Sequence, residues 1–262
     1  MRVALGVEYD GAAFRGWQTQ PGGGAVQDAL ETALAVIAGQ QVATVAAGRT
    51  DAAVHATGQV VHFDAPVDRP LSAWVRGVNS HLPAGVAVIW AHPVADDFHA
   101  RFSAQGRAYR YLLLNRPVRP AALASHVGWY HRPLDVARMQ SAADLLLGRH
   151  DFSAFRAAEC QARTPVRELR RATVTARGDW VVFDFAADAF LHHMVRNLVG
   201  SLVYVGKGAH PPEWVAEILA GRDRKLAAPT FSPHGLYLVA VDYESHWGLP
   251  PPPTDSFPLG VL

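Results

Sequence analysis

One carboxylate, Asp51, stands between two basic side chains at close spacing. Arg49 precedes it by two residues and His55 follows it by four. A positive group within a few ångströms favours the ionised form of a carboxylate, and a nucleophile or a general base requires that form. An Asp in a loop more often caps its own turn, but the two flanking basic groups favour a chemical role here.

The segments on either side of Asp51 determine where it lies. The short apolar strand Val42–Ala47 is predicted to lead into the loop, and the strand Gln59–Phe63 is predicted to lead out of it. Asp51 is therefore expected on a strand-to-strand connection, where a rigid sheet can direct side chains at a ligand.

A second polar run contains Asp96, Asp97, His99 and Arg101. Two carboxylates and a histidine suggest a metal-dependent hydrolase. Adjacent residues on an extended chain point to opposite faces, however, so they chelate poorly without further ligands. The thirteen histidines of the chain also follow no zinc-finger spacing. Bracing of a hairpin or contact with a substrate is therefore the favoured interpretation of His99 and Arg101.

The segment Arg107–Tyr111 alternates basic and aromatic residues and is predicted to be a strand. Its period of two places Arg107, Tyr109 and Tyr111 on one face and Arg110 on the other. A tyrosine beside arginines can stack on a nucleobase while the arginines hold phosphate. Ordinary aromatic packing within a sheet is the alternative that this pattern leaves open.

Arg196 lies in a largely apolar segment, residues 189–205, that has helical periodicity. A charged side chain in such a helix is destabilising unless it meets an opposite charge. We predict that Arg196 pairs with the carboxylate of Asp51.

Periodicity divides the chain into two α+β lobes. Residues 1–105 form the lobe that carries Asp51, residues 106–247 form the second lobe, and residues 248–262 form a Pro-rich tail that cannot continue a sheet. The other predicted strands span residues 2–9, 86–91, 107–115, 169–176, 180–186 and 235–242. The predicted helices span residues 71–78, 134–147, 189–205 and 213–220, together with one that begins at Val26 and ends at Gly39.

Composition excludes several classes of protein. Half of the residues are hydrophobic and 18% are charged, which suits a folded enzyme better than a disordered chain. No apolar run approaches the roughly 20 residues of a membrane span, and the chain starts directly as a strand, so no signal peptide is expected. The single cysteine, Cys160, excludes an internal disulfide and fits a reducing cytosol, so a cytoplasmic protein is expected.

Charge is less informative about the partner. The net charge is only +1, which gives no global basic signature for nucleic acid, but every Lys or Arg position except Lys207 and Lys225 is arginine. Arginine recognises phosphate through two parallel hydrogen bonds. Codon bias in a GC-rich genome explains the same composition, so both explanations stay open.

Motifs in a fixed order cover almost the whole chain, and they lie at residues 48–59, 96–103, 109–111, 151–156, 164–167, 192–200 and 235–238. In order and spacing they resemble the tRNA pseudouridine synthase A family. The run around Asp51, from Gly48 to Gln59, resembles the catalytic signature of that family.

The resemblance implies a fold, a reaction and partners. The fold would be α+β, with two RNA-recognition-motif-like (ferredoxin-like) lobes that share one long antiparallel sheet, helices packed on it and a basic central cleft. The reaction would be isomerisation of uridine to pseudouridine in the anticodon stem-loop of tRNA, at positions 38, 39 and 40, with no cofactor and no metal. A homodimer would bind one tRNA across both subunits.

The resemblance also implies roles for single residues. Asp51 corresponds to the nucleophile, which attacks either C1′ of the ribose or C6 of the base of a flipped-out uridine. Tyr109 corresponds to the tyrosine that stacks on the target base and assists proton removal from C5, and Arg196 corresponds to the arginine that pairs with the catalytic Asp. Arg49 would help to hold the flipped nucleotide. Weaker candidates for substrate contact are His55, Arg101, Arg107 and Arg110.

Ala53 departs from the family pattern, which usually has glycine at this position. A positive φ there would destabilise alanine by roughly 1 kcal/mol relative to glycine, without removing a reactive group. The alternative function is a non-catalytic RNA-binding module, because Tyr109 alone would suffice to stack on RNA. That alternative gives no reason for Asp51 to lie between Arg49 and His55.

Overall fold

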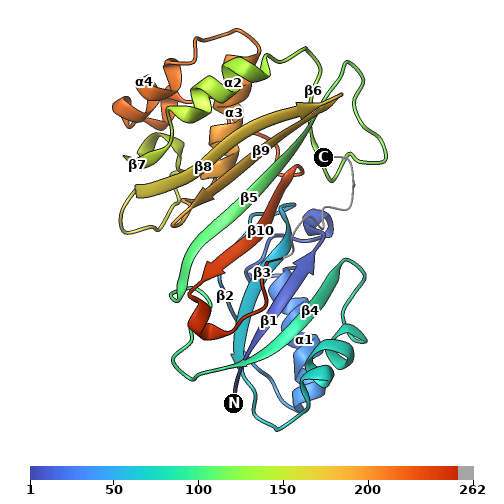
Figure 1. Cartoon of the computed structure of the whole chain (residues 1–262). Helices are drawn as coiled ribbons and strands as arrows, with labels where there is room; N and C mark the ends of the chain where they lie inside the picture. The colour runs from blue at the N-terminus through green and yellow to red at the C-terminus, as the bar shows by residue number, and fades with distance from the viewer. Residues whose placement is uncertain (253–262) are drawn as a thin grey trace. The chain divides into compact units, whose positions relative to one another are not determined.

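Residues 1–252 are described by a computed structural model, and they form two units in which helices pack against a sheet (Figure 1). The first unit contains Met1–Gln105 and the segment that begins at Tyr237, and the second contains Gly106–Leu236. The α+β class predicted from the sequence is confirmed. Residues 253–262, the end of the predicted Pro-rich tail, lie outside the described residues.

The sheet of the first unit has the strand order β4-β1-β3-β10, and β2 also pairs with β3. β1 runs antiparallel to β3 and β4, whereas β10 runs parallel to β3. The sequence pattern placed residues 237–247 in the second lobe, whereas the structure groups the segment that begins at Tyr237 with the first unit, in which β10 pairs with β3. The strands are β1 (Arg2–Tyr9), β2 (Val45–Ala46), β3 (His55–Asp64), β4 (Val86–Val94) and β10 (Leu236–Tyr243).

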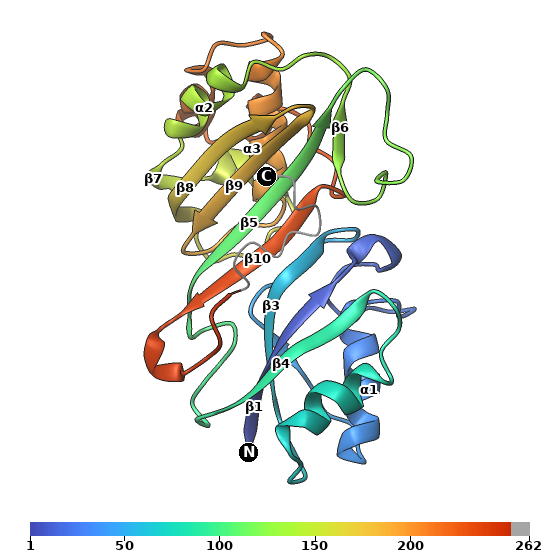
Figure 2. The same ribbon diagram turned by 45° about the vertical axis from the view of Figure 1, so that its right-hand side comes forward.

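Helix α1 (Val26–Ala38) packs against one face of this sheet, beside a helical segment that contains the π-helical turn Ala73–Gly77 (Figure 2). Leu30 and Leu34 of α1 are completely buried. The helix ends at Gly39, as predicted, where a φ of 74° gives the left-handed conformation that glycine adopts without strain.

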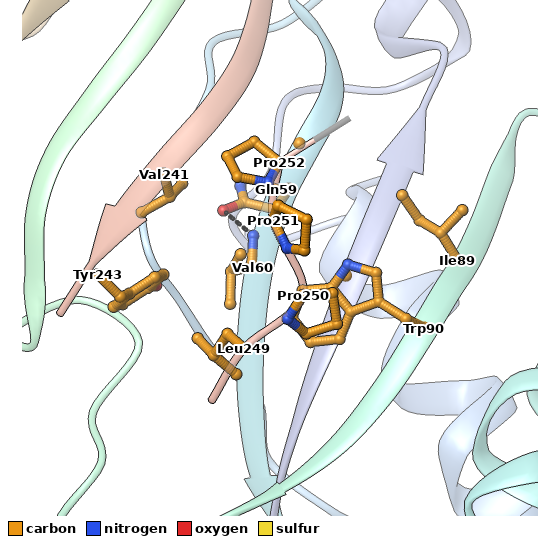
Figure 3. Close-up of a pocket in the computed structure, with 12 residues that line it drawn as sticks. Gln59, Val60, Ile89, Trp90, Val241, Tyr243, Leu249, Pro250, Pro251 and Pro252 are labelled. Carbon is orange, nitrogen blue, oxygen red and sulfur yellow. Dashed lines mark hydrogen bonds between the residues drawn. The ribbon is translucent and has the colours of Figure 1, made fainter. Parts of the chain in front are cut away.

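The chain that follows β10 lies over the same sheet (Figure 3). Leu249–Pro252 line a gap of about 20 Å³ together with Trp90, Tyr243 and Gly6. The ring of Trp90 lies against Gly6, where a Cβ atom would come within 2.2 Å of the indole Nε1. The described part of the Pro-rich tail therefore covers the sheet and does not extend it, because proline lacks the amide hydrogen that a strand needs.

The sheet of the second unit is antiparallel along the order β5-β9-β8-β7, and β6 runs parallel to β5. The strands predicted over residues 169–176 and 180–186 are both present, and the tight turn between them has Gly178 at a φ of 57°. The strands are β5 (Ala104–Asn115), β6 (Gly128–Tyr130), β7 (Gly148–Asp151), β8 (Val166–Arg177) and β9 (Trp180–Ala187).

Helices α2 (Val136–Asp144), α3 (Met194–Gly206) and α4 (Trp214–Gly221) lie on one side of this sheet (Figure 1). Gln140 of α2 bonds to β8 directly, because its side-chain oxygen accepts from Val174 N at 2.6 Å. Short 3-10 helices are formed by Gly11–Ala13, Ser153–Phe155, Arg224–Leu226 and Ser245–Trp247. Within residues 1–252, no helix has the length and apolar character needed to cross a membrane.

Several predicted elements are shorter than the sequence pattern indicated, among them the helix expected over residues 134–147, which spans Val136–Asp144. Two others begin later than expected. The helix expected over residues 189–205 begins only at Met194, because His193 adopts a left-handed φ of 62° at the N-cap position. The strand expected over Val42–Ala47 is reduced to Val45–Ala46. Apolar periodicity continues through both segments, and the backbone does not follow it.

Candidate active site

The loop that carries Asp51 connects β2 to β3, as predicted. Arg49 is exposed on this loop and Asp51 is half-buried. The Asp51 carbonyl accepts a hydrogen bond from Val54 N at 3.2 Å, and the Thr50 carbonyl accepts one from Trp17 N at 3.0 Å. The backbone on both sides of the carboxylate is therefore fixed, while Asp51 itself stays partly exposed.

Ala53 has a φ of 62°, in the left-handed region. Its departure from the family pattern therefore falls where the backbone disfavours alanine by roughly 1 kcal/mol relative to glycine. The neighbouring segment is equally tight, because a Cβ atom on Gly16 (φ 96°) would lie 2.8 Å from the Thr50 carbonyl oxygen. The loop is thus held in a conformation that few residue types allow.

Buried polar side chains hold the loop from inside the unit. They are Tyr9 of β1, Thr50 of the loop itself and Gln59 of β3, and we call this group the loop brace. The Tyr9 hydroxyl lies 2.8 Å from Thr50 Oγ1. Gln59 Nε2 donates to the Gly48 carbonyl at 2.7 Å and more weakly to the Tyr9 hydroxyl at 3.4 Å. None of the three residues is more than 8% exposed, so their polar groups need hydrogen-bond partners within the protein.

The residues of the loop brace are not among those predicted from the sequence. The sequence signal for this group is Gln59, a polar residue at the start of a strongly apolar strand. A buried amide requires hydrogen-bond partners, so an amide at this position indicates a polar group nearby in the fold.

His55 is only 1% exposed, at the start of β3. Its ring stacks on Tyr237 with centroids 4.6 Å apart, and its Nδ1 accepts from Gly11 N at 3.1 Å. Burial, and secondarily the charge of Asp10, raises the pKa of the Tyr237 hydroxyl, which therefore stays protonated. This placement favours a bracing role for His55 over the substrate contact expected from its position in the motif.

The second polar run forms the turn between β4 and β5. Asp96 and Asp97 are exposed. His99 Nδ1 accepts hydrogen bonds from the backbone amides of Arg101 at 3.2 Å and Phe102 at 3.3 Å. That nitrogen is therefore engaged within the turn, which supports the bracing interpretation of His99 over the metal-dependent one.

Tyr109 and Tyr111 share one face of β5, but they differ in burial. Tyr111 is completely buried, and its hydroxyl donates to the Ser232 carbonyl at 2.9 Å. Burial raises the pKa of this hydroxyl, so it is a neutral part of the core. Tyr109 is 9% exposed and meets Phe190 edge-on at 5.0 Å. The structure thus favours Tyr109 as the ring that meets a ligand.

The two arginines beside Tyr109 have different surroundings. Arg107 Nη1 donates to the Asp188 carbonyl at 3.2 Å. Arg110, on the opposite face, forms a half-buried bidentate pair with Asp184, with Nε and Nη2 at 2.7 and 3.3 Å from the carboxylate oxygens. Because Asp184 already neutralises Arg110, the structure disfavours the phosphate contact expected of that residue.

Arg196 lies in the first turn of α3, where its Nε donates to the Phe231 carbonyl at 2.9 Å. The Phe231 amide returns a hydrogen bond to the Arg196 carbonyl at 3.3 Å. Arg196 is thus oriented within the second unit. Asp51 belongs to the first unit, so the pairing of these two side chains stays a prediction.

The structure therefore brings the candidate residues together in two groups. The first unit presents a half-buried carboxylate, Asp51, beside the exposed Arg49, on a backbone that the loop brace fixes. A carboxylate held in this way can act as a nucleophile or as a general base. The second unit carries Tyr109 and Arg196.

Comparison with known proteins gives a consistent result. A family model described as tRNA pseudouridine synthase matches residues 6–103 and 142–244. A protein of Dechloromonas aromatica named tRNA pseudouridine synthase A is 66% identical over 262 residues, covering 100% of both chains. Proteins of the same name are 63% identical in Thiobacillus denitrificans (250 residues, 95% of this chain and 96% of the relative) and 56% identical in Paraburkholderia xenovorans (261 residues, 100% and 97%).

Proposed function

The chain belongs to the tRNA pseudouridine synthase family, and we infer from this membership that it is an isomerase that converts uridine to pseudouridine in tRNA. In this reaction the bond between N1 and C1′ breaks and a bond between C5 and C1′ forms. C5 loses a proton and N1 gains one, so the conversion balances without an oxidant, a reductant or a second substrate. The protein must therefore supply a nucleophile, a route for the proton and a fixed orientation of the base.

We propose that Asp51 is the nucleophile. Its support is the half-buried carboxylate on a fixed backbone, with the exposed Arg49 two residues before it in the sequence. Attack at C1′ displaces the uracil, and attack at C6 adds the carboxylate to the base. In both cases the uracil turns and its C5 bonds to C1′. Both routes of attack are compatible with a carboxylate held on this loop.

We propose that Tyr109 stacks on the target uracil and assists removal of the proton from C5. Of the two tyrosines on that face of β5 it is the more exposed, at 9% against 0% for Tyr111. We further propose that Arg196 pairs with Asp51 and that Arg49 holds the flipped nucleotide. A uridine in a duplex is reached only after it leaves the stack, which requires a stacking ring and a cationic anchor.

We propose that the substrate site is the anticodon stem-loop, at positions 38, 39 and 40, and that the protein works as a homodimer in the cytoplasm. The relatives named tRNA pseudouridine synthase A support a tRNA substrate. The single cysteine supports a reducing compartment. The competing function, a non-catalytic RNA-binding module, has no support in a family whose members are enzymes.

Tritium release from tRNA that contains 5-³H-uridine tests this function, because forming the new glycosidic bond expels the hydrogen on C5. We expect the wild-type protein to release tritium and Asp51→Asn to bind the same tRNA without release. Asp68→Asn is the matched control, since it removes the same charge from an exposed position of the same unit. Binding of tRNA by the wild-type protein without any release would contradict the proposal.

A further inference from the structure

Phe102 is 75% exposed, more than any other large hydrophobic side chain that the structure describes. It lies on the turn between β4 and β5, in the first unit. Exposed aromatic carbon is unfavourable in water, by about 25 cal/mol for each Å². An exposed phenylalanine on a folded turn therefore indicates contact with a binding partner.

The turn that holds Phe102 is internally bonded. His99 N donates to Ser103 Oγ at 3.0 Å, and Ser103 N donates to the His99 carbonyl at 2.8 Å. His99 Nδ1 accepts from the amides of Arg101 and Phe102. The backbone at Phe102 is thus fixed by its own neighbours.

The base of the turn is attached to the sheet of the first unit. The Ala100 amide donates to His62 Nδ1 at 3.1 Å, and the Ala100 carbonyl accepts from the Tyr243 hydroxyl at 2.6 Å. Phe98, at the start of the turn, is completely buried. Two strands, β3 and β10, therefore anchor the segment from which Phe102 projects.

The ring of Phe102 has one aromatic and one cationic neighbour. The His99 ring stacks on it with centroids 4.2 Å apart and an angle of 28° between the planes. The guanidinium carbon of Arg101 lies 5.6 Å from the centre of the Phe102 ring. Burial lowers the pKa of His99, so its imidazole is neutral and serves as an aromatic support for the ring.

We propose that Phe102 and Arg101 form a second nucleotide-binding site, at which an unpaired base of the tRNA stacks on the Phe102 ring and its phosphate meets the Arg101 guanidinium. The proposal rests on the inferred function insofar as the ligand is RNA. A rigid aromatic platform with an adjacent arginine is the arrangement that single-stranded RNA recognises without regard to sequence.

A second copy of this chain is the competing occupant, and the side chains around the ring disfavour it. The same turn carries two exposed charged residues, Asp97 and Arg101, and the Arg101 guanidinium lies beside the ring. Charged residues are depleted from the centres of protein–protein interfaces, which require a contiguous apolar patch. One ring with a charged border suits a nucleobase and its phosphate better.

The test measures the dissociation constant of an unmodified tRNA transcript from the full-length protein, together with tritium release at saturating tRNA. Stacking of one base accounts for a change of roughly 5- to 150-fold, so Phe102→Ala is expected to weaken binding by that factor and leave kcat unchanged. Phe102→Trp keeps the stacking face and is expected to bind within about threefold of wild type. Phe102→Leu keeps apolar area without a ring and is expected to behave like Phe102→Ala.

The control is Val118→Ala, which truncates another highly exposed apolar side chain (70%) and is expected to bind like wild type. Unchanged tRNA affinity in Phe102→Ala, with tritium release intact, overturns the second site and leaves the proposed function standing. Wild-type affinity in Phe102→Leu, with a shift in oligomeric state for Phe102→Ala, also overturns it in favour of a second copy. Absence of tritium release by the wild-type protein contradicts the proposed function alone, because the binding measurement still tests the site.

Discussion

Replacement of Gln59 by methionine tests whether the loop brace positions Asp51. The substitution keeps the length of the side chain and removes the donor that lies 2.7 Å from the Gly48 carbonyl and 3.4 Å from the Tyr9 hydroxyl. It also removes Oε1, which accepts from Val60 N at 3.2 Å, so three buried hydrogen bonds are lost, of which the one to Tyr9 is weak. We expect this loss to lower the free energy of unfolding by about 2 to 3 kcal/mol. If the lost hydrogen bonds reduce stabilisation of the transition state by the same free energy, kcat falls by up to roughly 100-fold, since about 1.36 kcal/mol corresponds to a factor of ten.

The assay compares single-turnover tritium release with urea unfolding and tRNA affinity. Asn79→Leu is the matched control, because Asn79 is a side-chain amide of the same unit that bonds Val88 N and the Val88 carbonyl, both at 2.8 Å. We expect both variants to lose stability, but only Gln59→Met to lose kcat, with unchanged affinity for tRNA. Equal stability losses with full kcat in both variants would refute a positioning role for the loop brace.

Three further outcomes follow from the described geometry. Ala53→Gly is expected to raise the urea midpoint by the equivalent of about 0.5 to 1 kcal/mol, because it relieves the left-handed backbone, and a lower midpoint would contradict this. Gly58→Ala is expected to lower the free energy of unfolding by about 1 to 3 kcal/mol, since the added Cβ would lie 2.2 Å from the Val239 carbonyl oxygen. A melting temperature that calorimetry finds unchanged would contradict this and show that β10 can shift. Burial, followed by the charge of Arg2, lowers the pKa of His62 to about 4 from an unfolded value of 6.5. Protons therefore bind the unfolded state first, and stability is full above pH 6.5 and declines toward pH 4, by up to about 2 kcal/mol at pH 5. His62→Asn should flatten urea midpoints measured across this range, and an unchanged slope would assign the pH dependence elsewhere.

Elements specified by local periodicity could be predicted from the sequence. β1 has the predicted bounds, and α1 stops at Gly39 as its spacing and terminal glycine indicate. Elements that depend on one backbone angle could not be predicted. The start of α3 is set by the left-handed conformation of His193, which the apolar spacing of residues 189–205 does not reveal.

Contacts between distant segments were beyond local patterns for a different reason. β10 pairs with β3 although most of the second unit separates them in the sequence, and periodicity alone placed β10 with its sequence neighbours. At the site, the motif identified Asp51 and Arg49, but the polar partners of Gln59 come from β1 and from the loop itself. The bidentate pair of Arg110 with Asp184 likewise depends on the register between β5 and β9.

The assignment of β10 to the first unit has a consequence for synthesis on the ribosome. Residues 1–105 leave the ribosome long before Tyr237, because the 131 residues from 106 to 236 come between them. At about 5 to 20 residues per second, this delay is roughly 7 to 26 s. During that time the nascent first unit lacks the strand that pairs with His55 and Ala56, at the start of the strand that follows the Asp51 loop. We therefore expect a ribosome-bound chain halted before Tyr237 to be far more sensitive to protease in residues 47–58 than the released protein.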